Sequence, residues 1–307
     1  MPIPLATFSN LTIFYCPGRA YMQAPQAFHT TMLPNRTSTK SLTVDCRYSL
    51  LTIIPRPYIF FYNCSKQCYA LKRLVNLYVP QNYDPQKQYP LVLFMHDAGT
   101  VSPENMATLY QGKGATVWTT PEWQAKNPCF VLAPQYDTVI VDDNYQYGPE
   151  LDRTMHLVKD LLGKYNIDPK RIYNTGQSMG GMTSIAMDVK YPDFFAASYL
   201  VACKWNEKVT APLSTQNIWA VAAGGDPGAS PSMTKILDGL ENNGAKVLRQ
   251  TLDSTASHAE MNQQAAALIV PDCHIYYTLY NNGGHRSTWQ HAYDLLPAME
   301  WIFAQHK

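Results

Sequence analysis

Residues 171–182 read RIYNTGQSMGGM, and this stretch decides the fold. It holds a Gly-x-Ser-x-Gly pattern at 176–180, after a strand-like run and before residues that favour a helix. In this pattern the serine occupies a tight strand-to-helix turn with strained backbone, which raises its hydroxyl above the sheet. Larger side chains two residues before and after the serine would strike neighbouring backbone, so glycine is needed there. We therefore predict that Ser178 is a nucleophile.

The chain becomes regular from about residue 75 onward. Short apolar runs alternate there with longer amphipathic stretches, a pattern typical of strand-helix units around a mostly parallel sheet. The predicted strands are Leu91–Met95, Phe130–Ala133, Arg171–Thr175, Ala197–Ala202, Ile218–Ala223 and His274–Leu279. The predicted helices are Glu150–Lys164, Met182–Lys190, Ser232–Asn242 and Thr288–Gln305. The predicted fold class is α/β, with a mostly parallel central sheet flanked by helices.

Residues 1–74 have a different character. Asp45 is their only acid, prolines recur, and neither helical nor strand periodicity persists. We predict an irregular N-terminal extension over 1–74, of unknown role, followed by a catalytic domain over 75–307.

Composition excludes several classes of function. The net charge is +1, charged residues make up 15%, and no Lys/Arg-rich run is present, so a nucleic-acid partner is not expected. No stretch of about 20 apolar residues suggests a membrane span, and no standard signal peptide is evident. Seven cysteines leave at least one thiol unpaired, and their spacing fits no zinc site, so no metal is predicted.

A nucleophilic serine needs a histidine base, which a carboxylate orients, in the chain order Ser, Asp/Glu, His. His285 follows the last predicted strand in the loop NNGGH at 281–285 and is the predicted base. Less suitable positions are those of His258, His274, His291 and His306. Asp226 follows the strand at 218–223 and is the predicted acid, with Asp253 as its rival.

Hydrolysis through such a serine builds negative charge on the substrate carbonyl oxygen, which backbone N–H groups must stabilise. Met179, directly after the nucleophile, is predicted to supply one N–H. Ala98, in the loop His96-Asp97-Ala98-Gly99, is predicted to supply the other, with Asp97 as the weaker candidate. We interpret the Asp97 side chain as a turn aspartate that satisfies its own loop, with a tuning role at the site mouth as the alternative.

Aromatic residues make up 12% of the chain, and four tryptophans could line an acyl or aryl pocket: Trp118, Trp123, Trp205 and Trp289. We predict substrate contacts for Trp205, which follows a strand end, and for Trp118. Simple packing is the competing explanation for each of these rings.

From about Val75 to Lys307 the chain resembles α/β-hydrolase esterases described as predicted peptidases or polyhydroxybutyrate-depolymerase-like esterases. The matching stretches are NLYVPQNYDPQKQYPLVLFMHDAG, GATVWTTPEWQAKNPCFVLAPQY, IDPKRIYNTGQSMGGM and GGHRSTWQHAYDLLPAMEWIF. Asp97 departs from the glycine usual after the loop histidine. Relatives often carry an N-terminal β-sandwich, which residues 1–74 lack the strand spacing to form.

The resemblance implies an α/β-hydrolase fold and a serine carboxylic-ester hydrolase without metal or organic cofactor. Ser178, Asp226 and His285 would form its triad. It implies acyl or feruloyl esters or polyesters as substrates, small or polymeric, and favours a secreted location. Two alternatives stay open: a serine peptidase of the prolyl-oligopeptidase type, which usually adds a large gating domain, and a non-catalytic binding protein on the same fold.

Overall fold

The computed structural model describes residues 12–16, 19–23, 59–61 and 75–307. The chain divides into two compact units, Met1–Pro55 and Arg56–Lys307. In the first unit, β1 (Thr12–Cys16) pairs antiparallel with β2 (Arg19–Gln23). Most of the predicted extension lies outside the described residues. This includes three of its four cysteines, all but Cys16.

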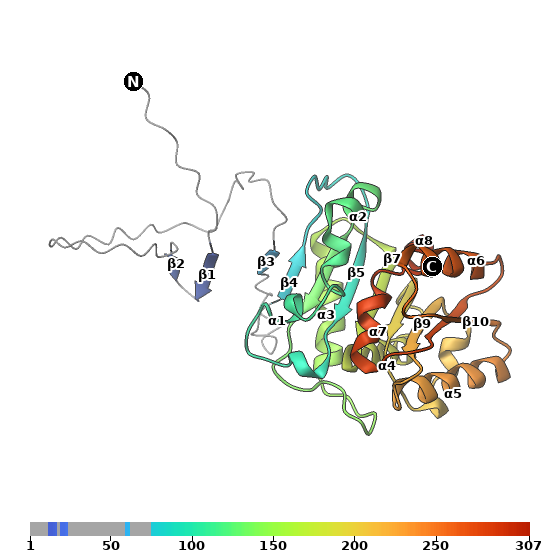
Figure 1. The fold of residues 1–307 in the computed structure, drawn as a ribbon. Coiled ribbons are helices and arrows are strands. Elements are labelled where there is room, and N and C mark those ends of the chain that lie inside the picture. The colour runs from blue at the N-terminus through green and yellow to red at the C-terminus, as the bar shows by residue number, and fades with distance from the viewer. Residues whose placement is uncertain (1–11, 17–18, 24–58, 62–74) are drawn as a thin grey trace, which may run out of the picture. The chain divides into compact units, whose positions relative to one another are not determined.

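The second unit holds a nine-stranded sheet (Figure 1) in the order β10-β11-β9-β8-β7-β5-β6-β4-β3. Neighbouring strands from β10 to β6 are parallel, whereas β4 is antiparallel to both β6 and β3. The strands are β3 (Ile59–Phe61), β4 (Val75–Tyr78), β5 (Tyr89–Met95), β6 (Phe130–Pro134), β7 (Ile167–Gln177), β8 (Ala197–Val201), β9 (Ile218–Ala223), β10 (Val247–Leu252) and β11 (Ile275–Tyr280). The mostly parallel α/β architecture predicted from the sequence is confirmed.

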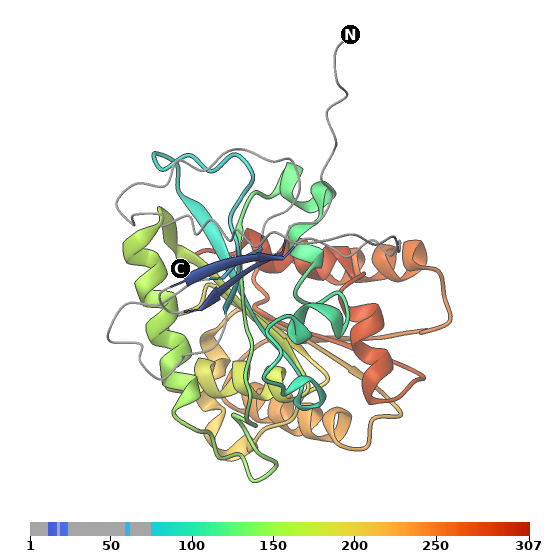
Figure 2. The same cartoon turned by 90° about the vertical axis from the view of Figure 1, so that its left-hand side faces the viewer.

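Helices cover both faces of this sheet (Figures 1 and 2). They are α1 (Ala107–Tyr110), α2 (Pro121–Lys126), α3 (Glu150–Lys164), α4 (Met179–Lys190), α5 (Ala229–Asn242), α6 (His258–Leu268), α7 (His285–Ala292) and α8 (Leu296–Ala304). Short 3₁₀ turns are η1 (Ala98–Thr100), η2 (Val117–Thr119), η3 (Glu207–Val209) and η4 (Ala211–Thr215). Side chains of α3, α4 and α5 join one buried cluster, and those of α2, α6, α7 and α8 join another.

Strand β5 shows how the sheet separates two cores. Leu91, Leu93 and Met95 point to the cluster under α3, α4 and α5, while Val92 and Phe94 point to the other cluster. All five are buried. This period-2 alternation with both faces apolar is what a parallel strand covered by helices requires.

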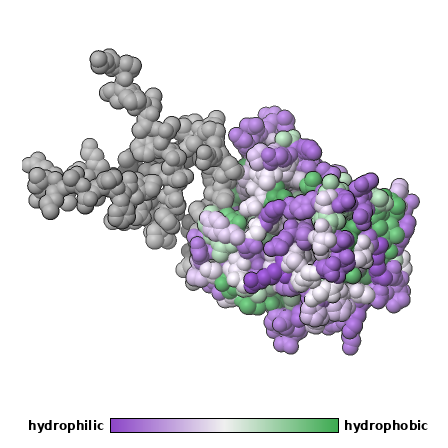
Figure 3. All heavy atoms as spheres, in the orientation of Figure 1, coloured by the Kyte–Doolittle hydropathy of each residue, from purple (hydrophilic) through white to green (hydrophobic). Residues whose placement is uncertain are grey.

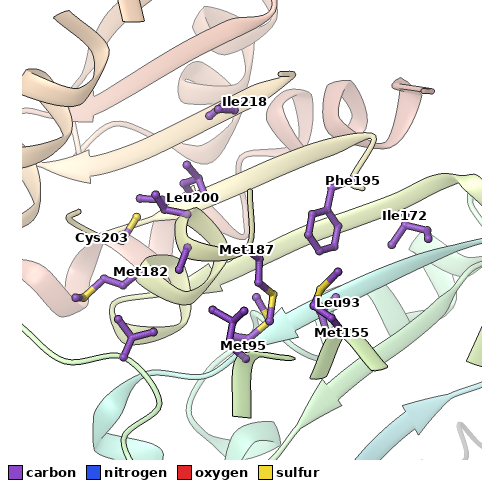
Figure 4. Close-up of a cluster of buried hydrophobic side chains, with 14 of the residues drawn as sticks. Leu93, Met95, Met155, Ile172, Met182, Met187, Phe195, Leu200, Cys203 and Ile218 are labelled. Atoms are coloured by element: carbon purple, nitrogen blue, oxygen red, sulfur yellow. The ribbon is translucent and has the colours of Figure 1, made fainter. Parts of the chain in front are cut away.

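The cluster on the α4 side is rich in sulfur-containing side chains (Figure 4). Met182 and Met187 of α4 belong to the same buried cluster as Met95, the last residue of β5, and Cys203, which follows β8. Their packing holds α4, and with it the turn before α4, firmly against the sheet.

Polar side chains share the outer surface shown in Figure 3 with smaller hydrophobic patches.

Three differences from the sequence prediction have physical explanations. β3 pairs with β4, so the sheet begins before residue 75. The helix predicted over 288–305 is two helices, α7 and α8, because Pro297 in the first turn of α8 lacks the N–H that a continuous helix needs. α6 arises in a polar stretch, where Ser257 and Glu260 form a reciprocal capping box that starts the helix.

Candidate active site

Ser178 lies between β7 and α4 with φ 54° and ψ −121°, a left-handed conformation that a residue other than glycine rarely adopts. Such strain persists only where the surroundings impose it. Two close approaches do so here. A Cβ on Gly176 would overlap the carbonyl carbon of Gly180, and a Cβ on Gly180 would overlap the carbonyl oxygen of Met95. The glycines therefore let β7, α4 and the end of β5 meet beneath the serine.

The three residues predicted as a triad come together at the carboxyl ends of their strands. The Ser178 hydroxyl and His285 Nε2 are 2.7 Å apart, and His285 Nδ1 is 2.5 Å from Asp226 Oδ2. His285 begins α7 just after β11, and Asp226 follows β9. Residues far apart in sequence thus form one hydrogen-bonded chain, as nucleophilic catalysis requires.

The Asp226 carboxylate is almost completely buried and held from two sides. Its Oδ1 accepts hydrogen bonds from the N–H groups of Gly228 and Ala229, each at 3.0 Å, and its Oδ2 faces His285. Burial is the largest single effect and acts to raise the pKa of Asp226. The hydrogen bonds from Ala229, His285 and Gly228 together outweigh it, so the pKa lies below its ordinary value.

An ionised Asp226 fixes the tautomer of His285. A carboxylate only accepts, so His285 Nδ1 carries the proton and donates to Asp226. Nε2 is left with a lone pair, toward which the Ser178 hydroxyl donates. This is the arrangement in which the imidazole can remove the serine proton.

The rival residues lie elsewhere. Asp253 is exposed and accepts hydrogen bonds from the N–H and hydroxyl of Thr255. His274 contacts Asn217, and His306 contacts the carbonyl of Ala304. His258 and His291 pack near each other, with ring centroids 6.4 Å apart. Among the histidines of the described residues, only His285 is hydrogen-bonded to the Ser178 hydroxyl.

The two N–H groups predicted to stabilise an oxyanion lie at starts of helical turns. Met179 is the first residue of α4 and Ala98 the first of η1, so neither N–H has an intrahelical acceptor. No other acceptor for them is found within the described part of the chain. The N–H of Asp97, the weaker candidate, donates instead to Gln111 Oε1 at 3.3 Å.

His96 is a residue whose role the sequence analysis missed. It is fully buried, its Nε2 accepts the N–H of Tyr136 at 3.0 Å, and its Nδ1–H donates to the carbonyl of Asp97 at 2.7 Å. Burial lowers the pKa of His96, which favours this neutral form. His96 thus anchors the loop that carries Ala98 to the end of β6.

The two tryptophans predicted as substrate contacts are both buried. Trp118 is 1% exposed, meets Trp123 edge-to-face and donates its indole N–H to the carbonyl of Gly114, contacts that favour the packing explanation. Trp205 is 4% exposed, and its ring meets that of Tyr145 edge-to-face with the ring centroids 5.4 Å apart. Trp289, a weaker candidate in the sequence, is half-buried against the His285 ring at 5.3 Å.

The described residues show no feature of a membrane span or of a metal site. No helix in this part of the chain has the length and apolar character needed to cross a bilayer. No group of three or more His, Cys, Asp or Glu side chains in the same residues is placed to bind a metal ion.

Residues 70–300 match the model of a family described as "Putative esterase". A thermostable esterase of known structure is 26% identical, with a TM-score of 0.64; the match covers 76% of this chain and 59% of that one. The chain therefore spans less than two thirds of that esterase.

More distant structures share the fold alone. The feruloyl esterase module of Clostridium thermocellum, solved with sinapinate, is 15% identical with a TM-score of 0.51, covering 74% of this chain and 82% of the module. S-formylglutathione hydrolase from Staphylococcus aureus is 12% identical with a TM-score of 0.53, covering 82% of this chain and all of the hydrolase. No curated protein matches the sequence.

Proposed function

The chain belongs to this esterase family, and on that premise we propose that it is a serine carboxylic-ester hydrolase that works through an acyl-enzyme on Ser178. The observation that carries the proposal is the continuous hydrogen-bonded chain from Ser178 through His285 to the buried Asp226. The strained backbone of Ser178 adds support, because strain of this kind clusters at functional sites.

Acylation begins when His285 Nε2 takes the Ser178 proton and the serine oxygen bonds to the ester carbonyl carbon. The negative charge that forms on the carbonyl oxygen is stabilised by the N–H groups of Ala98 and Met179. His285 then gives its proton to the departing alkoxide as the carbon–oxygen bond breaks. Asp226 stays ionised throughout and stabilises the imidazolium.

Deacylation repeats these steps with water. His285 removes a proton from a water molecule, whose oxygen attacks the acyl carbon. The second oxyanion collapses, the bond to the serine oxygen breaks, and that oxygen regains a proton from His285. The products are a carboxylic acid and an alcohol, and the enzyme returns to its starting state.

The substrate class we propose is acyl or feruloyl esters, or polyesters with similar linkages. Support comes from Trp289, whose half-buried indole lies against the ring of the proposed base His285, with ring centroids 5.3 Å apart. An aryl group could pack on such a ring.

The test compares p-nitrophenyl acetate, methyl ferulate and a peptide p-nitroanilide on the full chain. We expect both esters to be hydrolysed, and Ser178→Ala to lower kcat by about 10⁴-fold or more. Faster cleavage of the anilide than of either ester would replace the proposal with a serine peptidase. Trp289→Leu should raise KM for methyl ferulate more than for the acetate, whereas Trp301→Leu, on α8, should change neither KM.

A further inference from the structure

The Asp97 carboxylate is connected beyond its own turn. Its Oδ1 accepts the N–H of Gly99 at 2.6 Å, which caps η1. Its Oδ2 accepts from Gln177 Nε2 at 3.4 Å, and Gln177 directly precedes Ser178. One carboxylate thus joins the loop that carries Ala98 to the strand that carries the nucleophile.

Gln111 and Thr100 extend this connection to a third segment. Gln111 Oε1 accepts the N–H of Asp97 at 3.3 Å and the hydroxyl of Thr100 at 2.7 Å. The Thr100 hydroxyl is 3.3 Å from Asp97 Oδ2, but it has one proton and lies closer to Gln111. Gln177 is therefore the principal donor to Asp97 Oδ2.

The Asp97 carboxylate directly precedes Ala98, the proposed oxyanion donor, so its presence there needs an explanation. A negative charge beside the place where an oxyanion forms would oppose catalysis unless it serves another purpose. The Asp97 side chain accepts the N–H of Gly99, and Ala98 lies between these two residues. The cap therefore fixes the direction of the Ala98 N–H.

We propose that Asp97 is a positioning residue, which sets the Ala98 N–H relative to the Ser178 hydroxyl by bracing η1 against Gln177. This inference rests on the proposed function. It replaces the interpretation of Asp97 as a turn residue that serves only its own loop. Asp97 touches neither substrate nor the reacting atoms, so its effect must pass through Ala98.

The test measures kcat and KM for p-nitrophenyl acetate in Asp97→Ala and Asp97→Asn. Asp97→Ala should lower kcat about 10- to 100-fold with KM changed less than about threefold, because misplacing an oxyanion donor costs transition-state stabilisation. Asp97→Asn should stay within about threefold of wild type. Its Oδ1 can still cap Gly99. Its Nδ2 would face Gln177 Nε2, so the Gln177 amide must turn over to present Oε1, which has no partner in the described structure, as the acceptor.

The matched control is Asp84→Ala, which removes the same kind of cap, on the N–H of Gln86, away from the site. It should leave kcat within about twofold. Gln177→Met removes the donor at similar volume. If the brace is real, Asp97→Ala combined with Gln177→Met should lose no more kcat than Asp97→Ala alone.

A second readout separates positioning from general damage. A trifluoromethyl ketone, which forms a tetrahedral adduct with the serine, should bind Asp97→Ala more weakly by the same factor as kcat/KM falls, while binding of the product acid is unchanged. Equal kcat in Asp97→Ala and Asp84→Ala, or failure of Asp97→Asn to restore kcat, would overturn the inference. Failure of the proposed function itself would be a separate result, because the wild-type protein would then show no ester hydrolysis. If Asp97→Ala does not fold, Gln177→Met decides: the inference predicts a lower kcat in this variant, and a wild-type kcat would overturn it.

Discussion

Replacing Asp226 with asparagine probes the hydrogen-bonded chain at its most constrained point. Asp226 Oδ1 is held by two N–H donors, from Gly228 and Ala229. An asparagine that keeps these bonds must turn its amide NH₂ toward His285 Nδ1. The proton of the imidazole then moves to Nε2, which can no longer accept the Ser178 proton.

The amide could instead rotate to restore the correct tautomer, and the cost of that rotation sets the size of the effect. Its NH₂ would then face the N–H groups of Gly228, which is part-buried, and Ala229, which is buried, leaving both donors unpaired at about 1–3 kcal/mol each. The total of about 4 kcal/mol corresponds to a loss of about 10³-fold in rate. We therefore expect Asp226→Asn to lower kcat/KM by about 10³-fold.

The assay is steady-state hydrolysis of p-nitrophenyl acetate, with thermal unfolding as a check on folding. Asp253→Asn is the matched control, because Asp253 was the rival acid and its exposed carboxylate is hydrogen-bonded to Thr255 rather than to His285. It should retain at least about half of the wild-type rate. A folded Asp226→Asn that keeps more than about a tenth of wild-type kcat/KM would refute the role given to Asp226. So would a larger loss of kcat/KM in Asp253→Asn than in Asp226→Asn.

Three further predictions concern stability. Gly180→Ala should abolish ester hydrolysis and reduce soluble yield, because its Cβ would overlap the Met95 carbonyl oxygen. In the control Gly239→Ala, in α5, the new Cβ meets no neighbour, so this variant should raise the free energy of unfolding by up to about 1 kcal/mol. Burial raises the pKa of Asp188 from 3.8 to about 7, so its contribution to stability is full below pH 3.8 and is lost as the pH rises through about 7. Urea unfolding from pH 4 to 8 should show a smaller decline for Asp188→Asn than for wild type; equal declines would contradict this. Trp118→Phe should lower Tm, because it removes the hydrogen bond from the indole N–H to a buried carbonyl, and it should leave KM unchanged. A rise in KM at constant Tm would instead support a substrate contact for Trp118.

The predicted parts of the fold were those whose local pattern is strong. Leu91–Met95 and Ile218–Ala223 are unbroken apolar runs because they lie in the middle of the sheet, and both are strands. β10 was missed because, at the sheet edge, it exposes Arg249 and Thr251 and loses the apolar signal. The mixed polar sequence before α6 likewise concealed a helix start.

At the candidate site, too, residues with a local sequence signal were predicted and those without one were not. The chain order of serine, acid and base, with glycines around Ser178 and before His285, identified residues that the fold brings within hydrogen-bond distance. The contacts of His96 and Asp97 could not be predicted, because their partners Tyr136 and Gln177 are distant in sequence and polar contacts leave no periodic signal. The burial of Trp118 was equally invisible, since an indole suits a core as well as a pocket.

The central claim is that Ser178 is the nucleophile, and covalent labelling tests it most directly. The full chain is treated with a fluorophosphonate, digested with trypsin, and the peptide 172–190 is sequenced by mass spectrometry. We predict one adduct, located on Ser178 rather than on Ser184 of the same peptide, whose formation parallels the loss of ester hydrolysis and which is absent in Ser178→Ala. No adduct on an active, folded wild type, or equal labelling of Ser178→Ala, would contradict the account.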